Sequence, residues 1–342
     1  MKKKLIYLFS GFGLICLILI VITYRLLIGI SIYPDENGST LFIPSGSYYN
    51  QVLDTIGSNL DVKYPKLFDW LAKKKNYPVS IKPGKYIINE ALGINELINI
   101  LRSGRQITAR ITFNNIRTLN QLAGKFCKQI EADSLQIIEF LADESNFSAD
   151  GFARETIISL FIPDTYEFYW NTDPAGIYKR MLKEYKRFWN KDRMTRAGEK
   201  GLTPVEVSIL ASIIDDEVTK KDEKPRIAGV YLNRLKRGIP LQACPTIKYA
   251  LNDFTITRVL KVHLETESPY NTYKYKGFPP GPIGCPSIEG IDAVLSAEKH
   301  DYLYFAAKAD FSGYHNFSRT LAEHNRYAAE YQRELNKRKI YR

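Results

Sequence analysis

Hydrophobic positions recur at helical spacing along most of the chain, and shorter segments that alternate hydrophobic and polar residues lie between them. Helical and extended segments are mixed without an internal repeat, which predicts an α+β protein. The pattern predicts helices over residues 48–60, 65–75, 94–101, 119–130, 135–141, 177–189, 203–222, 225–238, 288–297 and 321–337. It predicts strands over residues 41–43, 85–88 and 107–113, and a hairpin over residues 302–307 and 314–317.

Other segments are predicted to lack regular structure. Residues 29–40 are expected to form a polar linker and residues 191–201 a charged, exposed connection, while residues 241–246 run extended. Residues 277–284 are too rich in proline and glycine for a helix or strand. The stiffness of proline would let this segment form a fixed wall.

The N-terminal segment is predicted to be a membrane anchor. The run Leu5–Tyr24 is uncharged, apolar and long enough to span a bilayer. A signal peptide would have a shorter apolar region and a small-x-small cleavage site, and no convincing site precedes Arg25. The lysines at positions 2–4 favour a cytoplasmic N-terminus. We therefore expect a cytoplasmic tail over residues 1–4, a single-pass anchor over residues 5–28 in the cytoplasmic (inner) membrane, and an extracytoplasmic, periplasmic remainder.

Composition adds a positive charge and an excess of tyrosine. The 342 residues carry a formal net charge of +11, and tyrosines number 23 against 3 tryptophans. The charge favours anionic surroundings such as lipid headgroups or acidic cell-wall polymers. Tyrosine rings can stack on sugars, although they serve equally in cores and interfaces. We expect no nucleic-acid partner, because we find no nucleic-acid-binding motif.

The cysteines and histidines give no metal-binding pattern. No CxxC or His/Cys ligand spacing occurs, so we expect no zinc or other metal site. Cys244 and Cys285 each precede a proline in the candidate site region, and an oxidising compartment would permit a disulfide between them. The sequence does not supply their separation, so pairing stays open.

The helix predicted to begin at residue 203 and to end near residues 220–222 carries the candidate catalytic acid, Glu217, close to its C-terminal end. Thr203 can cap this helix, and Glu206 stands where a capping-box acid reaches back to the cap. At about 100° per residue, Glu217 continues the apolar stripe, whereas Asp215 projects to the opposite face. A carboxyl group held against hydrocarbon keeps its proton at neutral pH, as a general acid for glycosidic cleavage requires.

A structural interpretation of Glu217 stays open. A glutamate near the C-terminal end of an amphipathic helix is often solvated, and Lys220 or Lys221 could neutralise it. Perturbed carboxylates are also common in structural ion pairs.

Amide and phenol side chains could form a sugar-binding set around this acid. Such groups hydrogen-bond hydroxyl and N-acetyl groups, and tyrosine faces stack on pyranose rings. The proline-bounded segment over residues 161–170 could also face a groove, although Asp followed by Thr is an ordinary turn signal as well. The candidate substrate-binding residues are Gln242, Tyr270, Asn271, Tyr273, Asn316, Asp164 and Tyr166.

Motifs in several segments occur together and in a fixed order. They lie in Phe161–Tyr166, Ala211–Glu217, Gly229–Leu235, Leu241–Thr246, Tyr270–Tyr273, Gly277–Ile283 and Glu323–Asn325. The linked set resembles the endolytic murein transglycosylase family (MltG, YceG-like), and the resemblance covers nearly the whole exported part. It implies a LysM-like domain over residues 41–106 and a larger α+β catalytic domain over residues 107–342, with its core over residues 155–342.

The resemblance also places the family's catalytic glutamate on Glu217. It implies non-hydrolytic cleavage of the β-1,4 bond between N-acetylmuramic acid and N-acetylglucosamine, which leaves 1,6-anhydro ends. One carboxyl group would act twice, first as acid and then as base, without a metal or an organic cofactor. The expected partners are peptidoglycan glycan strands, the cytoplasmic membrane and peptidoglycan synthases. The chain departs from the family at Asp215, where Glu is usual, and at Cys244, where Asp is common.

Two other functions stay open. A lysozyme-like hydrolase would pair Glu217 with Asp164, Glu167 or Asp253. A non-catalytic envelope scaffold would bind glycan through residues 41–103. A metal-dependent deacetylase or peptidase is poorly supported, because the histidines fit no ligand motif that we recognise.

Overall fold

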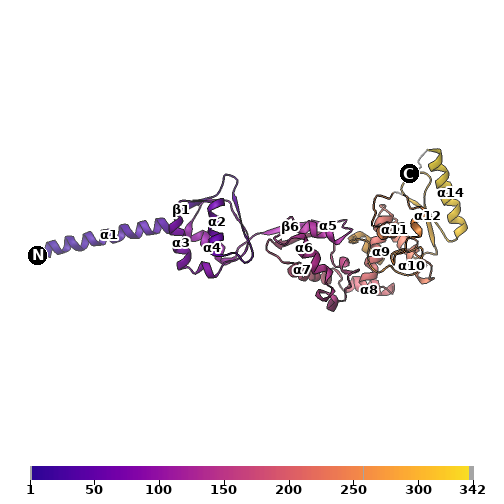
Figure 1. The fold of residues 1–342 in the computed structure, drawn as a ribbon, viewed down its shortest axis with the longest axis horizontal. Helices are drawn as coiled ribbons and strands as arrows, with labels where there is room; N and C mark the ends of the chain where they lie inside the picture. The colour runs from indigo at the N-terminus through magenta and orange to yellow at the C-terminus, as the bar shows by residue number, and fades with distance from the viewer. Residues whose placement is uncertain (1, 257, 339–342) are drawn as a thin grey trace. The chain divides into compact units, whose positions relative to one another are not determined.

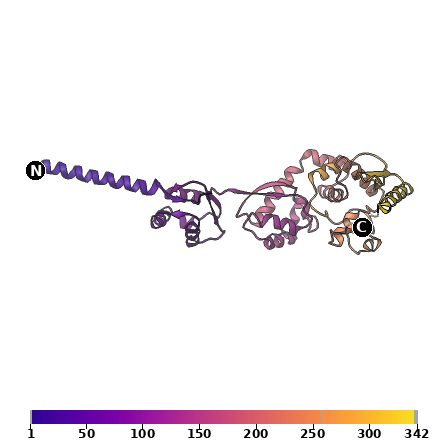
Figure 2. The ribbon, with the colours of Figure 1, turned by 90° about the horizontal axis from the view of Figure 1, so that it is seen from above.

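The computed structural model describes residues 2–256 and 258–338, except for the side chains of residues 2–10, 26 and 27. The chain forms two compact units, each described by itself (Figure 1, and Figure 2 from above). The first unit comprises Met1–Ile111, Gln129–Ala132 and Glu167–Asp173, and the second comprises Thr112–Lys128, Asp133–Tyr166 and Pro174–Arg342. Helices and short strands are mixed in both, so the predicted α+β class is confirmed.

The first unit begins with α1 (Lys2–Ile28). Among the residues whose side chains the structure describes, no helix combines the length and the apolar character that crossing a bilayer needs. The expected anchor over residues 5–28 falls on α1, and its residues 5–10, 26 and 27 lie outside the described side chains.

Small antiparallel sheets and short helices form the core of the first unit. In the β2–β4 pair, Leu41 and Ile43 are buried whereas Phe42 is exposed, as the alternation of a half-buried strand requires. The sheets are β3 (Asp61–Val62), β1 (Ile30–Tyr33) and β5 (Leu92–Gly93) in that order, and β2 (Ser39–Ile43) with β4 (Gly84–Ile88). The helices that follow α1 are α2 (Tyr49–Asn59), α3 (Pro65–Lys74) and α4 (Ile94–Ser103), and η1 (Tyr77–Val79) is a short 3₁₀ turn.

The prediction of a linker over residues 29–40 is wrong. This stretch contains β1, which pairs antiparallel with β3 and β5, and its Ser31 and Ile32 are 1% and 0% exposed. Only the turn after it is polar, where Gly38 has a φ of +82° and its N–H donates to Asp35 O at 2.8 Å. Short strands of this kind carry too few residues for their periodicity to stand out beside a polar turn.

The second unit is mostly helical. Its helices are α5 (Leu119–Phe126), α6 (Ser134–Ala142), α7 (Pro174–Phe188), α8 (Lys191–Glu199), α9 (Pro204–Glu217), α10 (Lys224–Lys236), α11 (Cys244–Ala250), α12 (Lys261–Leu264), α13 (Ile288–Leu295) and α14 (Leu321–Lys337). β8 (Tyr304–Ala307) and β9 (His315–Ser318) form the predicted antiparallel hairpin. β6 (Thr108–Phe113) pairs with β7 (Asp164–Tyr169), and the residues of each strand are divided between the two units.

Helix α9 lies at the centre of the second unit's core. It packs against α8, α10, α11 and α13, and every residue from Val207 to Ile214 is buried. The buried surface of this helix is therefore wider than the single apolar stripe that the spacing predicted. The helix is buried on all sides, so Asp215 near its end does not point into solvent and is half-buried. The cluster that forms this core also includes residues of α10 and α13.

Two segments expected to be irregular are helices, so those predictions are wrong. The connection over residues 191–201 contains α8, where the side chain of Asn190 caps the helix by accepting a hydrogen bond from Arg193 N at 3.0 Å. The guanidinium of Arg193 also contacts α13, which ties this highly charged helix to the core. Residues 241–246, expected to be extended, run into α11, where Pro245 occupies a first-turn position that suits it.

Candidate active site

Glu217 is the last residue of α9, and the predicted capping box fixes where this helix begins. Thr203 N donates to Glu206 Oε2 at 2.7 Å, and Glu206 N donates to Thr203 Oγ1 at 3.2 Å. The buried residues that follow fix the rotation of the helix in the core. The cap and the core together therefore determine where the Glu217 carboxyl group lies.

Glu217 lines a cavity of about 300 Å³. The cavity is assembled from α9, α10, the start of α11, the loop before α13, the strand β8 and the helix α14. Among the lining residues in the described part of the chain, Glu217 is the one with a carboxyl group. The lining residues are Glu217, Tyr231, Arg234, Leu241, Gln242, Cys244, Tyr273, Tyr304, Phe305, Leu321 and His324.

Glu217 is half-buried, and one of its two carboxyl oxygens is shielded from solvent. Burial raises its pKa from 4.5 to about 7, because the charged form loses solvation there. The positive charges of Lys248 and Arg234 lower the pKa, while the negative charge of Asp216 raises it. Glu217 Oε2 is buried and has no hydrogen-bond partner among the described residues. Such a group can hold a proton near neutral pH and transfer it to a molecule in the cavity.

Neither neighbouring lysine neutralises Glu217. Lys221 Nζ lies 2.6 Å from Glu289 Oε2. Lys220 Nζ lies over the Tyr314 ring, 4.9 Å from its centre. The interpretation of Glu217 as half of a structural ion pair with these lysines is therefore not what the structure shows.

Arg234 forms a buried polar wall of the cavity. This residue is only 7% exposed, and its Nε donates to Leu303 O at 2.6 Å. Its Nη1 donates to Leu241 O at 2.8 Å and to Gln242 Oε1 at 3.2 Å. Gln242 has a φ of +52°, and its N–H donates to Thr272 O at 2.9 Å. A residue other than glycine adopts this backbone only where its surroundings impose it, so these contacts hold Gln242 at the cavity.

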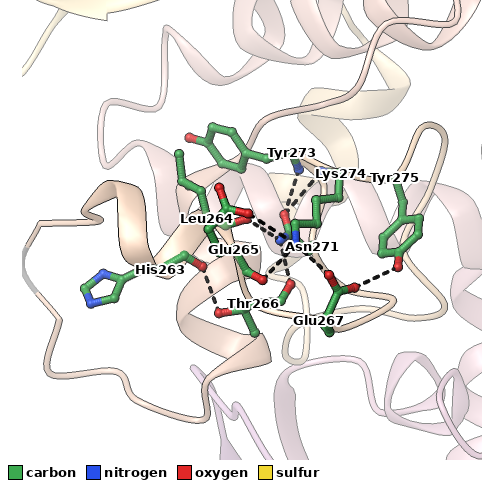
Figure 3. A network of polar contacts seen from close by, with 9 residues as sticks. All are labelled: His263, Leu264, Glu265, Thr266, Glu267, Asn271, Tyr273, Lys274 and Tyr275. Atoms are coloured by element: carbon green, nitrogen blue, oxygen red, sulfur yellow. Dashed lines mark hydrogen bonds and ion pairs between the residues drawn. The ribbon is translucent and has the colours of Figure 1, made fainter.

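Asn271 organises the loop that carries Tyr273 (Figure 3). Asn271 is fully buried, and its Nδ2 donates to Leu264 O at 2.9 Å and to Thr266 O at 2.8 Å. Its Oδ1 accepts hydrogen bonds from Tyr273 N at 3.0 Å and from Lys274 N at 3.3 Å. Both polar atoms of the Asn271 amide are therefore occupied by hydrogen bonds within this loop. Asn271 contributes to the site by placing Tyr273, whose side chain lines the cavity.

The other predicted substrate-binding residues do not line the Glu217 cavity. Tyr270 packs on Tyr249 with the ring centres 4.7 Å apart. Asn316 lies on β9 opposite β8, and Asp164 Oδ1 accepts a hydrogen bond from the next backbone N–H. Tyr166 is buried, and its hydroxyl donates to a backbone carbonyl oxygen at 2.7 Å. Of the predicted set, the structure therefore brings Gln242 and Tyr273 together with Glu217.

Comparison with known proteins identifies the family. The model of the YceG-like family matches residues 41–330. The chain belongs to the YceG-like family. The resemblance noted in the sequence is thereby confirmed.

Relatives of this YceG-like chain include enzymes named endolytic murein transglycosylase. The one from Bacillus subtilis (strain 168) is 32% identical over 307 residues, which cover 84% of this chain and 83% of the relative. The one from Streptococcus pneumoniae serotype 2 (strain D39) is 28% identical over 323 residues, which cover 85% of this chain and 58% of the relative. The crystal structure of a YceG-like protein from Listeria monocytogenes has a TM-score of 0.55 and 26% identity, and the match covers 85% of this chain and 99% of that one.

Asp215 and Cys244, the positions where this YceG-like chain was expected to depart from its family, each line a cavity. Cys244 Sγ lies 3.1 Å from the Tyr273 hydroxyl oxygen, at the wall of the Glu217 cavity. Cys285 lines a different cavity of about 690 Å³, together with Asp215 and others. Both cysteines are free thiols, so the disulfide that the sequence left open is not formed.

The sequence alone did not identify several residues that line the site. Tyr231, Arg234, Tyr304 and His324 come from α10, β8 and α14, far apart in the chain. The described residues hold no group of metal-binding side chains, so His324 belongs to no metal-binding cluster among them. Its place in the matching segment Glu323–Asn325 was the one available signal, and it did not point to the cavity.

Proposed function

We propose that this YceG-like protein is an endolytic peptidoglycan lytic transglycosylase that acts through Glu217. It cleaves the β-1,4 bond between N-acetylmuramic acid and N-acetylglucosamine within glycan strands and leaves 1,6-anhydro-N-acetylmuramic ends. The relatives' names agree with the expected enzyme class. The observation that carries the proposal is a carboxyl group whose Oε2 atom is buried without a partner and whose pKa is raised to about 7, in a cavity that has no other lining carboxylate among the described residues.

The chemistry uses the carboxyl group of Glu217 twice. Protonated Glu217 donates its proton to the glycosidic oxygen as the bond from the muramic C1 to that oxygen breaks. The resulting carboxylate takes the proton of the sugar's 6-hydroxyl as O6 bonds to C1, and this step restores the acid. No water is consumed. A pKa near 7 suits both steps, because neither protonation state is then strongly disfavoured at neutral pH.

The remaining site residues bind the sugar or support residues that do. Gln242 and Tyr273 are the predicted substrate-binding residues that reach the cavity, where an amide and a phenol can hydrogen-bond hydroxyl and N-acetyl groups. We assign Asn271 to the support of Tyr273. Tyr270, Asn316, Asp164 and Tyr166 stay candidates for contacts with sugars farther along a strand, and the exposed Asp164 is the most accessible of them.

The site's location in the cell is part of the same proposal. The lysines at positions 2–4 and the apolar run Leu5–Tyr24 support a single-pass anchor in the cytoplasmic membrane, with the N-terminus in the cytoplasm. The catalytic domain would then be extracytoplasmic and act on nascent strands near peptidoglycan synthases, where cleavage terminates strand elongation. A LysM-like domain over residues 41–106 would hold the glycan. Co-purification of the full-length protein with none of the synthases would count against that partnership.

The test is product analysis on purified sacculi. Wild-type protein should release anhydro-muropeptides, and Glu217→Gln protein should fold normally yet release none. The exposed acid Glu139 offers a matched Glu139→Gln control, which should retain activity. An active Glu217→Gln protein would show that the assignment is wrong.

The same products separate the rival functions. A lysozyme-like hydrolase leaves a reducing end heavier by one water, and mass spectrometry resolves this difference. Asp164, Glu167 and Asp253, the proposed second carboxylates, are not among the residues that line the Glu217 cavity, which favours the single-carboxyl mechanism. A scaffold would keep its function with Glu217 replaced and lose it when residues 41–103 are deleted.

A further inference from the structure

The Glu217 cavity contains a second buried polar atom without a partner. His324 lines the cavity from α14, and its Nδ1 is buried with no hydrogen-bond partner among the described residues. Buried polar atoms in folded proteins nearly always have partners. Two unpaired atoms, Glu217 Oε2 and His324 Nδ1, line one cavity of about 300 Å³, so a ligand in that cavity can supply both partners.

The His324 ring is held in a fixed orientation. α14 begins with a capping box between Thr320 and Glu323, which defines the turn that carries His324. The imidazole stacks on the Tyr304 ring, with centres 5.4 Å apart and planes 28° apart. The Arg234 guanidinium in turn lies 4.9 Å from the centre of Tyr304. A ring held by this stack does not have to be ordered when a ligand binds, which favours a strong, directional hydrogen bond.

The chemical state of His324 suits an uncharged ligand group. Burial lowers the pKa of His324, and the nearby positive charge of Arg234 lowers it further. The imidazole is therefore neutral at pH 7, with one nitrogen that donates and one that accepts. A neutral imidazole forms no ion pair with the Glu217 carboxylate that appears during the reaction. It can hydrogen-bond a hydroxyl or an acetamido group.

We propose that His324 is a substrate-binding residue of the Glu217 site, whose imidazole hydrogen-bonds a hydroxyl or acetamido group of the N-acetylhexosamine next to the Glu217 carboxyl group. This inference rests on the proposed function, because it names the sugar as the ligand. It makes α14, more than 100 residues after Glu217 in the chain, part of the substrate site. The alternative role for His324 is packing alone, through its stack on Tyr304.

Two substitutions separate these roles. His324→Phe keeps an aromatic ring for the stack on Tyr304 but removes both nitrogens. His324→Asn loses the stack, but its amide nitrogen and oxygen lie near the position of Nδ1. A binding role predicts that Asn preserves function better than Phe, and a packing role predicts the reverse. His263→Phe is the matched control, since His263 Nδ1 already accepts a hydrogen bond from Leu260 N at 3.1 Å and His263 does not line the cavity.

The experiment measures binding and turnover separately in the full-length protein. Binding of purified uncross-linked glycan strands is measured by calorimetry in the Glu217→Gln background, where no cleavage occurs. Turnover is measured as anhydro-product release in the wild-type background. We expect His324→Phe to weaken glycan binding and to lower kcat/KM roughly tenfold, because a buried sugar group loses its partner. His324→Asn should stay within about threefold of the parent protein, and His263→Phe should match it.

Each outcome decides the inference. Parental binding and turnover in His324→Phe overturn it, as does a larger loss in Asn than in Phe. Thermal unfolding is measured for each variant. If His324→Phe unfolds while His324→Asn stays folded, the glycan affinity of the Asn variant decides between the roles. An affinity within about threefold of the parent protein supports the binding role, and a larger loss overturns it. If wild-type protein binds glycan but makes no anhydro ends, the proposed function fails while the His324 contact can still hold. If wild-type protein makes them and His324→Phe is unaffected, only the inference fails.

Discussion

Lys224 Nζ donates a hydrogen bond to Asp215 Oδ1 at 2.8 Å, and the Lys224 side chain is only 9% exposed. The Asp215 oxygens also accept hydrogen bonds from Ser287 N at 2.6 Å and from Ser287 Oγ at 2.8 Å. This carboxylate therefore joins the end of α9 to the starts of α10 and α13. Asp215 precedes Glu217 by only two residues, so these contacts also fix the end of the helix that carries Glu217.

Removing this charge should destabilise the fold. We expect Asp215→Asn to lower the free energy of unfolding by about 1–3 kcal/mol, because Lys224 loses a buried partner. Urea denaturation measures this change. The exposed Asp222 provides the control, and Asp222→Asn should change stability by less than about 0.5 kcal/mol. Equal stability of the Asp215 and Asp222 variants would mean that the buried pair does not stabilise the native state.

The pH dependence of turnover should report the pKa of Glu217. The acid must be protonated to start cleavage, so kcat/KM should fall as pH rises through about 7. Lys248 lowers this pKa and Asp216 raises it. Lys248→Ala should therefore move the alkaline limb to higher pH, and Asp216→Asn should move it to lower pH. A pH–rate profile of each protein checks the pair of opposite shifts, and shifts of the same sign would contradict the assignment.

Glu217 should also make stability depend on pH. Its pKa in the folded protein is about 7, above the ordinary value of 4.5, so the folded state binds the proton more tightly than the unfolded state does. The resulting cost of the charged form is absent below about pH 4.5, grows as pH rises, and is complete above about pH 7. Glu217→Gln removes this cost and should stabilise the protein by up to about 3 kcal/mol at pH 8, with little effect at pH 4. Denaturation at both pH values measures the difference, and a gain that is the same at pH 4 and pH 8 would contradict it.

Asn271 should control the loop that carries Tyr273. Asn271→Ala removes hydrogen bonds to four backbone groups and leaves buried polar groups unpaired. We expect a loss of roughly 2–4 kcal/mol in stability and a lower kcat at saturating substrate. Limited proteolysis should cut the loop over residues 264–275 first. The exposed Asn120 gives the control Asn120→Ala, which should leave the cleavage rate of that loop unchanged.

Local sequence was sufficient where neighbouring residues determine the structure. The capping box of Thr203 and Glu206, the bounds of α14 and the β8–β9 hairpin all follow from side chains close in the chain and from periodicity. The same periodicity extended this helix to about residues 220–222, whereas α9 ends at Glu217, so the end of the helix was not predicted. Local rules failed for α8 and β1, where contacts with distant segments stabilise elements that their own residues only weakly favour.

The sequence by itself indicated the family, the α+β class and the candidate catalytic acid, because motifs, periodicity and caps act over a few residues. Only the tertiary structure decided which side chains surround that acid. Tyr304 and His324 approach Glu217 because β8 and α14 fold back against the helices of the second unit, and no spacing along the chain encodes that approach. The raised pKa of Glu217 has the same origin, since burial is a property of the packed molecule rather than of the residue.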